Sequence, residues 1–397
     1  MRLLLNKIKL DNFYSLFSKE LNQDRIFGLD LLRFFAVTTV IIGHGAYLLP
    51  KKIAELHKYI TFDGVNIFFA LSGFLIGGIL IKQLENNKAS FSLLLDFWIR
   101  RWFRTLPTYF LILIILTFCY SITDPSFTFA QIKKFYIFCQ NLYYPPPTYY
   151  FRESWSLSVE EWFYFTIPLF IFILINFLKF NPKTSILSTS VFVILVIGFL
   201  KYRIYLDPVK ASAFSLYHNQ VVIRLDSIMF GVIAAYINYY YSKIWNSIPL
   251  QLLITGICIF LIQKYIYIFG GLPTNWIPFY YIVLDYNLTS VATVLLLPYL
   301  SNFRKTKYKI GNLITIISLI SYSMYLTHMS LIKNTILKGI PWTNFTTNYN
   351  IILPVVYCLY WILTIAFSIF LYKFYEIPTT RLREKFVLKR HKNTLIE

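Results

Sequence analysis

Residues 29–49 read LDLLRFFAVTTVIIGHGAYLL, an apolar run of membrane length with Arg33 near its start and His44 near its end. An ionisable side chain inside a membrane is costly and normally faces a protein interior or a water-filled cavity. The two positions differ by eleven residues, close to three helical turns, so both side chains are predicted to project from nearly the same face, roughly 16 Å apart. This first span is therefore predicted to line one cavity, with a guanidinium group at one depth and an imidazole at another.

The composition is that of a membrane protein with many spans. Of the 397 residues, 57% are hydrophobic and only 14% are charged, and the mean hydropathy is +0.57. Such a chain is too apolar to fold as soluble domains. We therefore expect an all-α, polytopic transmembrane bundle of about ten spans, at residues 29–49, 62–82, 97–119, 159–178, 186–205, 221–241, 250–268, 280–300, 314–337 and 351–375.

The distribution of Lys and Arg predicts the orientation of these spans. Segments on the side of the N-terminus carry many more of them than segments on the opposite side, which favours both termini in the cytosol. No small-residue cleavage site follows the first apolar run, so we interpret it as an uncleaved anchor. The predicted organisation is a basic cytosolic segment at 1–28, a transmembrane domain at 29–376 and a basic cytosolic tail at 377–397, which we expect to be solvated or to face lipid.

The formal net charge of +20 does not indicate a nucleic-acid partner, because the basic residues flank spans and form no single soluble face. Contact with anionic membrane lipid explains them better. The four cysteines show no paired metal-ligand spacing, and no metal site is predicted.

Arg101 and Arg104 open the third span and share one helical face, which suits two guanidinium groups that hold phosphate oxygens. The alternative is a positively charged anchor at the cytosolic interface. With Arg33 at a similar level, the inner mouth of the bundle is predicted to hold an anion, such as a phosphorylated donor.

The outer half of the bundle is predicted to hold acid and base groups. A histidine beside a carboxylate can remove a proton from a hydroxyl group, although a lone intramembrane histidine also serves structural or proton-relay roles. Asp63 and Asn66 are candidates to support His44. The residues predicted to converge in this half are His44, Asp63, Asn66, Glu160, Glu161, Arg224, Asp226 and His328. The span 186–205 shows no feature that we assign to a site.

Several of these polar residues have structural alternatives. Glu160 and Glu161 point about 100° apart on a helix, so one is expected to face the bundle while the other caps the helix or meets water. Ser158 followed by Glu161 fits a capping box. Ser72 and Gly73 fit a close helix crossing, and Arg224 with Asp226 fits ion pairing with a neighbouring helix.

The chain resembles the integral-membrane acyltransferase-3 family, whose members acylate surface polysaccharides such as lipopolysaccharide O-antigen, exopolysaccharide and peptidoglycan. Arg33 and His44 match its signature of an arginine, ten residues and a histidine. Other matches are the FFxxSG block at 68–73, the RxxR motif at 101–104 and the WSLSxEExFY block at 155–164, and the segments around Arg224, 321–328 and Glu376 are similar to later family segments. The resemblance runs from about residue 26 to 382.

The resemblance implies that His44 is the catalytic base, with Arg33 and Glu160 or Glu161 acting beside it. It implies that Arg101, Arg104 and Arg33 hold an acetyl-coenzyme A donor. Residues expected to meet the acceptor are Asp63, Asn66, Ser72, Trp155, Ser156, Arg224, Asp226 and His328. Asn66 stands where the commoner family form has aspartate, so a carboxylate there is not assumed.

The function implied by the resemblance is O-acetylation in the bacterial inner membrane. The acyl group would move from a cytosolic acyl-CoA to a hydroxyl of O-antigen, exopolysaccharide or a lipid-linked saccharide, without a metal or an obligatory protein partner. We expect no extracytoplasmic hydrolase-like domain in this chain. The alternatives are a transporter or flippase for a polar lipid or small anion, for which internal repeats would be typical and none is seen, and a membrane sensor that uses its histidines.

Overall fold

The computed structural model describes residues 14, 16–21, 24–143, 150–274, 276–306, 308 and 310–393, with side chains as far as residue 386. These residues form helices and connecting segments and include no strand. Nine helices among them are long and apolar enough to cross a membrane. The predicted all-α polytopic bundle is confirmed. Most of the predicted N-terminal segment, residues 1–13, 15 and 22–23, lies outside the described part.

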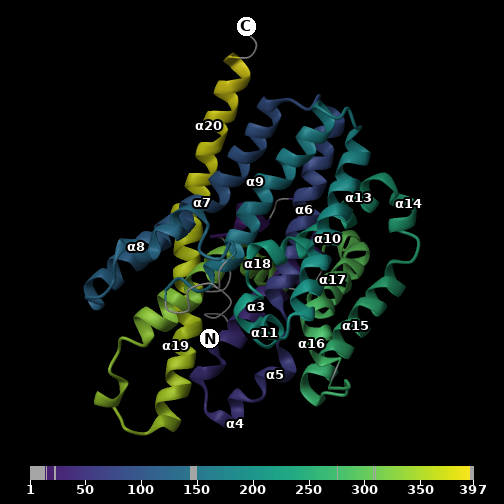
Figure 1. The fold of residues 1–397 in the computed structure, drawn as a ribbon. Helices are drawn as coiled ribbons and strands as arrows, with labels where there is room; N and C mark the ends of the chain where they lie inside the picture. The colour runs from purple at the N-terminus through teal and green to yellow at the C-terminus, as the bar shows by residue number, and fades with distance from the viewer. Residues whose placement is uncertain are drawn as a thin grey trace.

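The main helices are α3 (Phe27–Gly45), α6 (Gly64–Asn86), α7 (Phe91–Thr123), α9 (Ser154–Asn176), α10 (Pro182–Leu206), α13 (Leu225–Tyr240), α15 (Pro249–Phe269), α17 (Asp285–Asn302), α18 (Ile310–Thr327), α19 (Tyr349–Leu371) and α20 (Ile377–Asn393) (Figure 1). The short α-helices are α2 (Ser18–Leu21), α4 (Lys51–Ala54), α5 (His57–Ile60), α8 (Phe129–Ile132), α11 (Pro208–Ser212), α12 (Phe214–Tyr217), α14 (Ser242–Trp245) and α16 (Ile277–Phe279). The predicted span 221–241 corresponds to α13, which has 16 residues and is shorter than the nine membrane-length helices.

Three π-helical segments interrupt or extend these helices: η4 (Tyr280–Leu284), η5 (His328–Leu337) and η7 (Tyr372–Glu376). Four 3₁₀ segments complete the fold: η1 (Ala46–Leu48), η2 (Lys133–Ile137), η3 (Val221–Ile223) and η6 (Trp342–Asn344). A π turn widens a helix locally and is frequent at functional sites. Two of the three begin or end at a residue singled out in the sequence, His328 and Glu376.

The first span is anchored at its N-terminus by the end of α17. The backbone N–H groups of Phe27 and Gly28 donate to the carbonyls of Arg304 and Phe303 at 3.1 and 2.8 Å. Gly28 permits this approach, since a Cβ there would lie 2.1 Å from the Leu300 carbonyl oxygen. These bonds satisfy amide groups that a helix start leaves open, and they set the position of Arg33 further along α3.

The close crossing predicted at Ser72 and Gly73 is present between α6 and α13. A Cβ on Gly73 would lie 1.9 Å from the Ile228 carbonyl oxygen, and one on Gly231 would lie 2.0 Å from that of Ala70. Small residues let two backbones approach in this way. Around the crossing, α6, α9 and α13 bury apolar residues such as Phe69, Phe163 and Ile228 in one continuous core.

The capping box predicted at Ser158 and Glu161 is wrong. Helix α9 begins at Ser154, a full turn earlier, so Ser158 already lies inside the helix and its hydroxyl donates to the Ser154 carbonyl at 3.4 Å. Glu161 instead accepts a hydrogen bond from Thr105. Its carboxylate therefore links α9 to α7.

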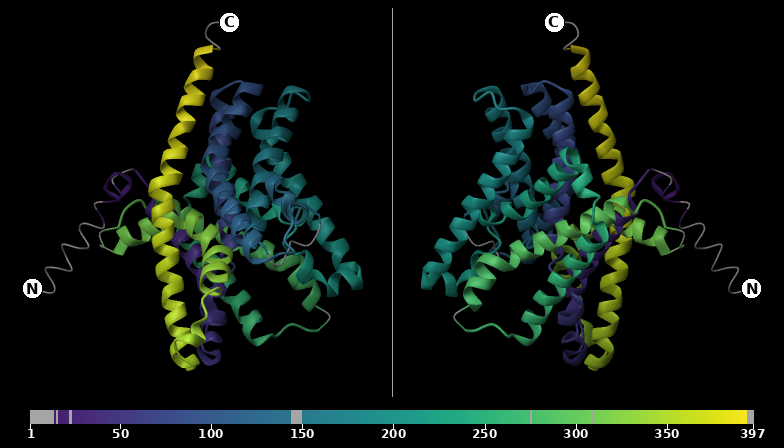
Figure 2. Two further views of the ribbon diagram at one scale, coloured as in Figure 1. Left: turned by 90° about the vertical axis from the view of Figure 1, so that its left-hand side faces the viewer. Right: turned by 90° about the vertical axis from the view of Figure 1, so that its right-hand side faces the viewer.

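The C-terminal tail continues the last span as a helix. Helices α19, η7 and α20 form one long column beside the bundle (Figure 2). Helix α20 packs on α7 through Phe386 and Phe103, whose ring centroids are 5.1 Å apart. The tail is thus partly docked, and not only solvated or lipid-facing as expected; residues 394–397 lie outside the described part.

Candidate active site

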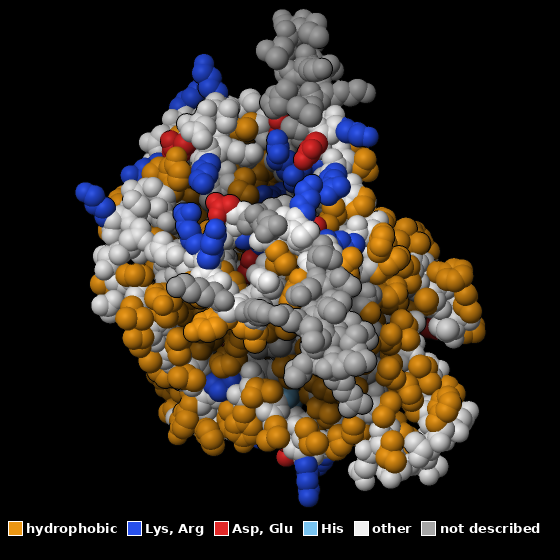
Figure 3. All heavy atoms as spheres, turned by 180° about the vertical axis from the view of Figure 1, so that it is seen from behind, with side chains coloured by type: hydrophobic (Ala, Val, Ile, Leu, Met, Phe, Trp, Pro, Cys, Tyr) orange, Lys and Arg blue, Asp and Glu red, His pale blue; other side chains and the backbone are white. Residues whose placement is uncertain are grey.

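A cavity of about 790 Å³ opens among α3, α6, α7, α9 and α18. Five cationic side chains line it, against two carboxylates: Arg33, Lys82, Arg101, Arg104 and Arg304, with Glu160 and Glu376. Lys and Arg side chains gather on the upper half of the face in Figure 3, around a hollow, while hydrophobic side chains dominate its lower half. This excess of positive charge within a membrane bundle favours an anionic ligand.

A second cavity of about 610 Å³ adjoins the first and shares Arg33, Arg104 and Glu376 with it. Arg381 and Arg383 of α20 also line it. Asp30 lies at its wall and holds Arg25 at 2.5 Å, with an Arg33 nitrogen 3.9 Å away. The arginine side of the bundle is therefore assembled from α3, α7 and α20.

The two neighbouring glutamates of α9 face different surroundings. Glu160 lines the large cavity, and its carboxylate accepts hydrogen bonds from Ser72 at 2.9 Å and Tyr164 at 3.1 Å. Glu161 is buried and accepts from Thr105 at 2.7 Å. Glu160 thus belongs to the cavity, whereas Glu161 belongs to the interface between α9 and α7.

Tyr325 and Ser156 line the cavity on the side away from the arginines. The Ser156 hydroxyl donates to the Tyr325 oxygen at 2.7 Å, and the Tyr325 hydroxyl donates to the Glu153 carbonyl at 3.1 Å. Behind Tyr325 lies His328, with ring centroids 5.8 Å apart. Tyr325 therefore separates the cavity from the histidine.

His44 and His328 form a pair on that far side. His44 Nδ1 lies 2.8 Å from His328 Nε2, and the two rings are nearly parallel, with an interplanar angle of 5°. His328 is fully buried, whereas His44 is partly exposed. Arg33 lines the cavity but His44 does not, so the expectation that both residues face this one cavity is wrong; the lining residue in ring contact with the histidine pair is Tyr325 of α18.

Polar groups of the loop before α9 support the histidine pair. Glu153 accepts hydrogen bonds from the Ser330 amide at 3.0 Å and the Ser330 hydroxyl at 2.5 Å. Burial raises the pKa of Glu153 to about 7, and the hydrogen bonds from Ser330 oppose that rise. Lys333 donates to the His44 carbonyl at 2.5 Å. These contacts hold η5, and with it His328, against α3 and α9.

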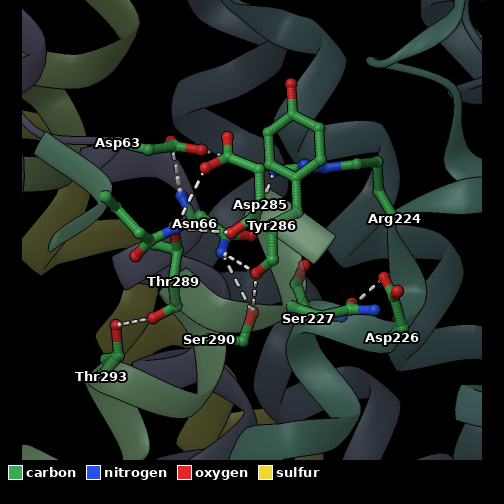
Figure 4. A network of polar contacts seen from close by, with 12 residues as sticks. Asp63, Asn66, Arg224, Asp226, Ser227, Asp285, Tyr286, Thr289, Ser290 and Thr293 are labelled. Atoms are coloured by element: carbon green, nitrogen blue, oxygen red, sulfur yellow. Dashed lines mark hydrogen bonds and ion pairs between the residues drawn. The ribbon is translucent and has the colours of Figure 1, made fainter. Parts of the chain in front are cut away.

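Arg224, Asp63 and Asn66 form a separate network with α17 (Figure 4). The Arg224 guanidinium lies 3.7 Å from the centre of the Tyr286 ring and donates to Asn66 at 3.1 Å, with Asp63 3.9 Å away. Asp63 also caps α6 by accepting from the Asn66 amide at 3.0 Å. Among the described residues, His44 makes its side-chain hydrogen bond to His328 and not to Asp63 or Asn66.

Asp226 pairs with Lys201 of α10, and both side chains are completely buried. Arg224 and Asp226 are thus two distinct contacts with neighbouring helices, as the ion-pair alternative allowed. Lys201 was missed by the sequence reasoning, which assigned nothing to the span 186–205. The signal was present, since an ionisable residue inside a span requires a partner.

The family profile described as an acyltransferase domain matches residues 26–373. The chain belongs to the acyltransferase-3 family. The matched range includes the arginines that line the large cavity, Glu160 and the histidine pair. Membership in this family favours the enzyme over the transporter and the sensor among the predicted alternatives.

Relatives in this family carry O-acetyltransferase names. The chain is 29% identical over 330 residues to O-acetyltransferase OatA of Staphylococcus aureus, covering 77% of this chain and 50% of that protein. It is 32% identical over 172 residues to peptidoglycan O-acetyltransferase OatA of Listeria monocytogenes, covering 39% of this chain and 25% of that one. The chain thus spans about half the length of the S. aureus relative and about a quarter of the length of the Listeria relative. No solved structure matches it.

Of the sequence-predicted residues, the cavity brings together Arg33, Ser72, Arg101, Arg104, Ser156 and Glu160. His44 and His328 meet beyond Tyr325, while Asp63, Asn66, Arg224 and Trp155 gather in the aromatic network around Tyr286. Glu161 and Asp226 lie in helix interfaces. Tyr325, Lys333 and Glu153 complete the site and were not assigned from the sequence.

Proposed function

We propose that this acyltransferase moves an acetyl group from acetyl-coenzyme A, held on the arginine side, to a hydroxyl group of a surface glycan on the His44 side. The observation that carries the proposal is the cation-lined cavity whose far end, at Tyr325 and Ser156, adjoins a histidine pair. The O-acetyltransferase names of the relatives support the acetyl group and the hydroxyl acceptor. The arginine side faces the cytosol and the bundle lies in the bacterial inner membrane in this proposal.

The donor fits the charge of the cavity. Coenzyme A carries several phosphate charges, and Arg101, Arg104 and Arg33 present guanidinium groups that bind phosphate oxygens with two hydrogen bonds at a time. The volume of about 790 Å³ lies within the range of small-molecule sites. Arg383 of α20, at the adjoining cavity, adds a further phosphate contact.

The acceptor meets His44 on the opposite side. His44 is partly exposed and takes the proton of the acceptor hydroxyl as the oxygen forms an ester bond with the acetyl carbon. The carbon–sulfur bond of the thioester breaks in the same transfer, and the leaving sulfur receives a proton. The acetyl group has to pass Tyr325, whose hydroxyl is held by Ser156 and the Glu153 carbonyl, so the transfer requires this ring to move aside.

The acceptor class is a bacterial surface glycan. Peptidoglycan is named for the Listeria relative and is the first to assay, with O-antigen, exopolysaccharide and lipid-linked saccharides as the other acceptors that the family resemblance implies. No obligatory protein partner is part of this proposal.

The test is mass spectrometry of surface glycans from cells in which the gene is deleted, restored, or restored as His44→Ala. His57→Ala is the matched control, because His57 bonds the backbone of Ala54 in the interfacial segment at α4 and α5. We expect one acetyl mass increment to disappear on deletion, to return with the normal and His57→Ala genes, and to stay absent with His44→Ala when membrane insertion is unchanged. Identical glycans in all strains would overturn the glycan acceptor.

A further inference from the structure

We propose that His328 is a positioning residue that fixes the tautomer of His44, so that His44 Nε2 carries the lone pair that accepts the acceptor's proton. This inference rests on the proposed role of His44 as the base. It assigns His328 to the orientation of His44 and not to contact with the acceptor.

The assignment of protons begins at His328 Nδ1. This atom lies 2.8 Å from the Tyr325 carbonyl oxygen and 3.1 Å from the Met324 carbonyl oxygen. Carbonyl oxygens only accept hydrogen bonds, so Nδ1 must carry a proton to meet them. A neutral imidazole holds one proton, and His328 Nε2 is therefore an acceptor.

The neutral form of His328 follows from its surroundings. Its side chain is fully buried, and the charged side chains that act on the histidine pair include two cations, Lys333 and Arg152. A buried cation without a carboxylate partner is unfavourable. The Glu153 carboxylate is engaged by Ser330.

The proton of His44 is then also determined. His44 Nδ1 faces the His328 Nε2 acceptor at 2.8 Å, so Nδ1 carries the proton and donates it. The lone pair of neutral His44 lies on Nε2. Within the described part of the chain His44 Nε2 has no hydrogen-bond partner, and the partly exposed ring leaves it open to a hydroxyl group.

The π-helical segment makes this arrangement possible. His328 is the first residue of η5, and its imidazole bonds the carbonyls three and four residues earlier. In a regular α-helix the carbonyl four residues earlier is bonded by the backbone N–H of the residue itself. The wider turn leaves these oxygens available to a side chain, which directs Nε2 of His328 at α3.

A catalytic triad uses a carboxylate for the same task, where loss of the correct histidine tautomer lowers kcat by orders of magnitude. Here a neutral imidazole, itself oriented by backbone carbonyls, replaces the carboxylate. His328 is out of reach of the acceptor because both of its ring nitrogens are engaged.

The test compares two amide replacements in purified protein in liposomes, with acetyl-coenzyme A as the donor and peptidoglycan fragments as the acceptor probe. In His328→Gln the amide oxygen reaches the position of Nε2 and can accept from His44, whereas the shorter side chain of His328→Asn reaches only the position of Nδ1. We expect kcat to fall about 100-fold in His328→Ala, to fall similarly in His328→Asn and to recover at least tenfold in His328→Gln. The donor KM is expected to stay unchanged in all three.

The second readout is the nitrogen NMR spectrum of the protein with 15N-labelled histidine, in which the His44 signals are assigned by their loss in His44→Ala. We expect His44 Nδ1 to be protonated in the normal protein and the Nε2-protonated form to appear in His328→Ala. Normal kcat in His328→Ala, or a protonated Nε2 in the normal protein, would overturn the inference. If His44→Ala retains full transfer, the proposed role of His44 as the base is wrong. The NMR spectrum still shows which of the two histidines donates the hydrogen bond between them.

Discussion

Lys201 of α10 and Asp226 of α13 form an ion pair in which neither side chain is exposed to solvent. A charge in this position has no water to solvate it, so each partner depends on the other. The pair holds the start of α13 against α10, next to Arg224 and the close crossing with α6.

We expect Lys201→Met to lower the free energy of unfolding by about 3–5 kcal/mol, because it leaves the Asp226 carboxylate buried without a partner. Replacing both residues, Lys201→Met with Asp226→Leu, should recover most of that loss. Thermal unfolding in detergent measures both. Lys210→Met is the matched control, since the Lys210–Asp207 pair is exposed and its loss should not be measurable. Equal effects of the two lysine changes would contradict the prediction.

Two glycine-to-alanine changes, one at the helix crossing and one away from it, are expected to have opposite effects on stability. Gly73→Ala places a methyl group against the Ile228 carbonyl and should lower stability by about 1–3 kcal/mol. Gly198→Ala adds the same methyl group where no atom lies within 4 Å, and helix propensity should raise stability by about 0.5–1 kcal/mol. Unfolding curves of the two variants in one detergent decide this; a stable Gly73→Ala variant would mean that the helices separate easily.

Replacing both Arg101 and Arg104 by Gln should raise the KM for acetyl-coenzyme A at least tenfold, since charge-assisted hydrogen bonds contribute about 1.5–3 kcal/mol each. Initial rates at increasing donor concentration measure it. Lys88→Gln, an exposed residue between α6 and α7, is the control for a general loss of positive charge. An unchanged KM in the double variant would leave the arginines with a role in topology alone.

Glu160 and Glu161 should respond differently to the same change. Glu160→Gln removes a negative charge from the cavity and is expected to lower the transfer rate about tenfold or more with little effect on stability. Glu161→Gln alters a contact between α9 and α7 and should lower stability while the rate per folded molecule stays near normal. Rates and unfolding temperatures of both variants test this, and the reverse assignment would place Glu161 at the reaction.

The raised pKa of Glu153 predicts that the stability of the protein depends on pH. Its pKa is raised by burial from 4.5 to about 7, so between these values the unfolded chain loses its proton while the folded protein keeps it. Stability should therefore fall by about 3 kcal/mol as the pH rises from 4.5 to 7 and level off above that range. Glu153→Gln should remove the part of the slope that this carboxyl contributes, whereas Glu55→Gln, at an exposed position, should leave the slope unchanged. A slope that is as steep in Glu153→Gln as in the normal protein would contradict the prediction.

The spans could be predicted because long apolar runs have few alternatives in a chain of this composition. The arginine side was also predictable, since the spacing of Arg101 and Arg104 places both on one face and both line the cavity. The capping box failed because the motif is local, and the helix starts earlier than the motif assumes. Lys201 was overlooked although its residue type carried the signal.

The histidine pair could not be derived from spacing. His44 and His328 are 284 residues apart, and no local pattern predicts that one ring nitrogen will face the other. The Tyr325 ring, which lies between His328 and the cavity, comes from the turn before His328 on the same helical stretch. Such relationships depend on how the helices pack and not on the period of any one helix.

The π turn at His328 sets the register of everything that follows it in the segment. One residue corresponds to about 100° of helical rotation, so removal of one residue from His328–Leu337 to restore regular pitch would turn Ser330 and Lys333 to another face. The Glu153 carboxylate would then lose its donors and the His44 carbonyl its ammonium partner. The extra residue of the π-helical segment thus keeps η5 in register with two other parts of the chain, the Glu153 carboxylate and the backbone of α3 at His44.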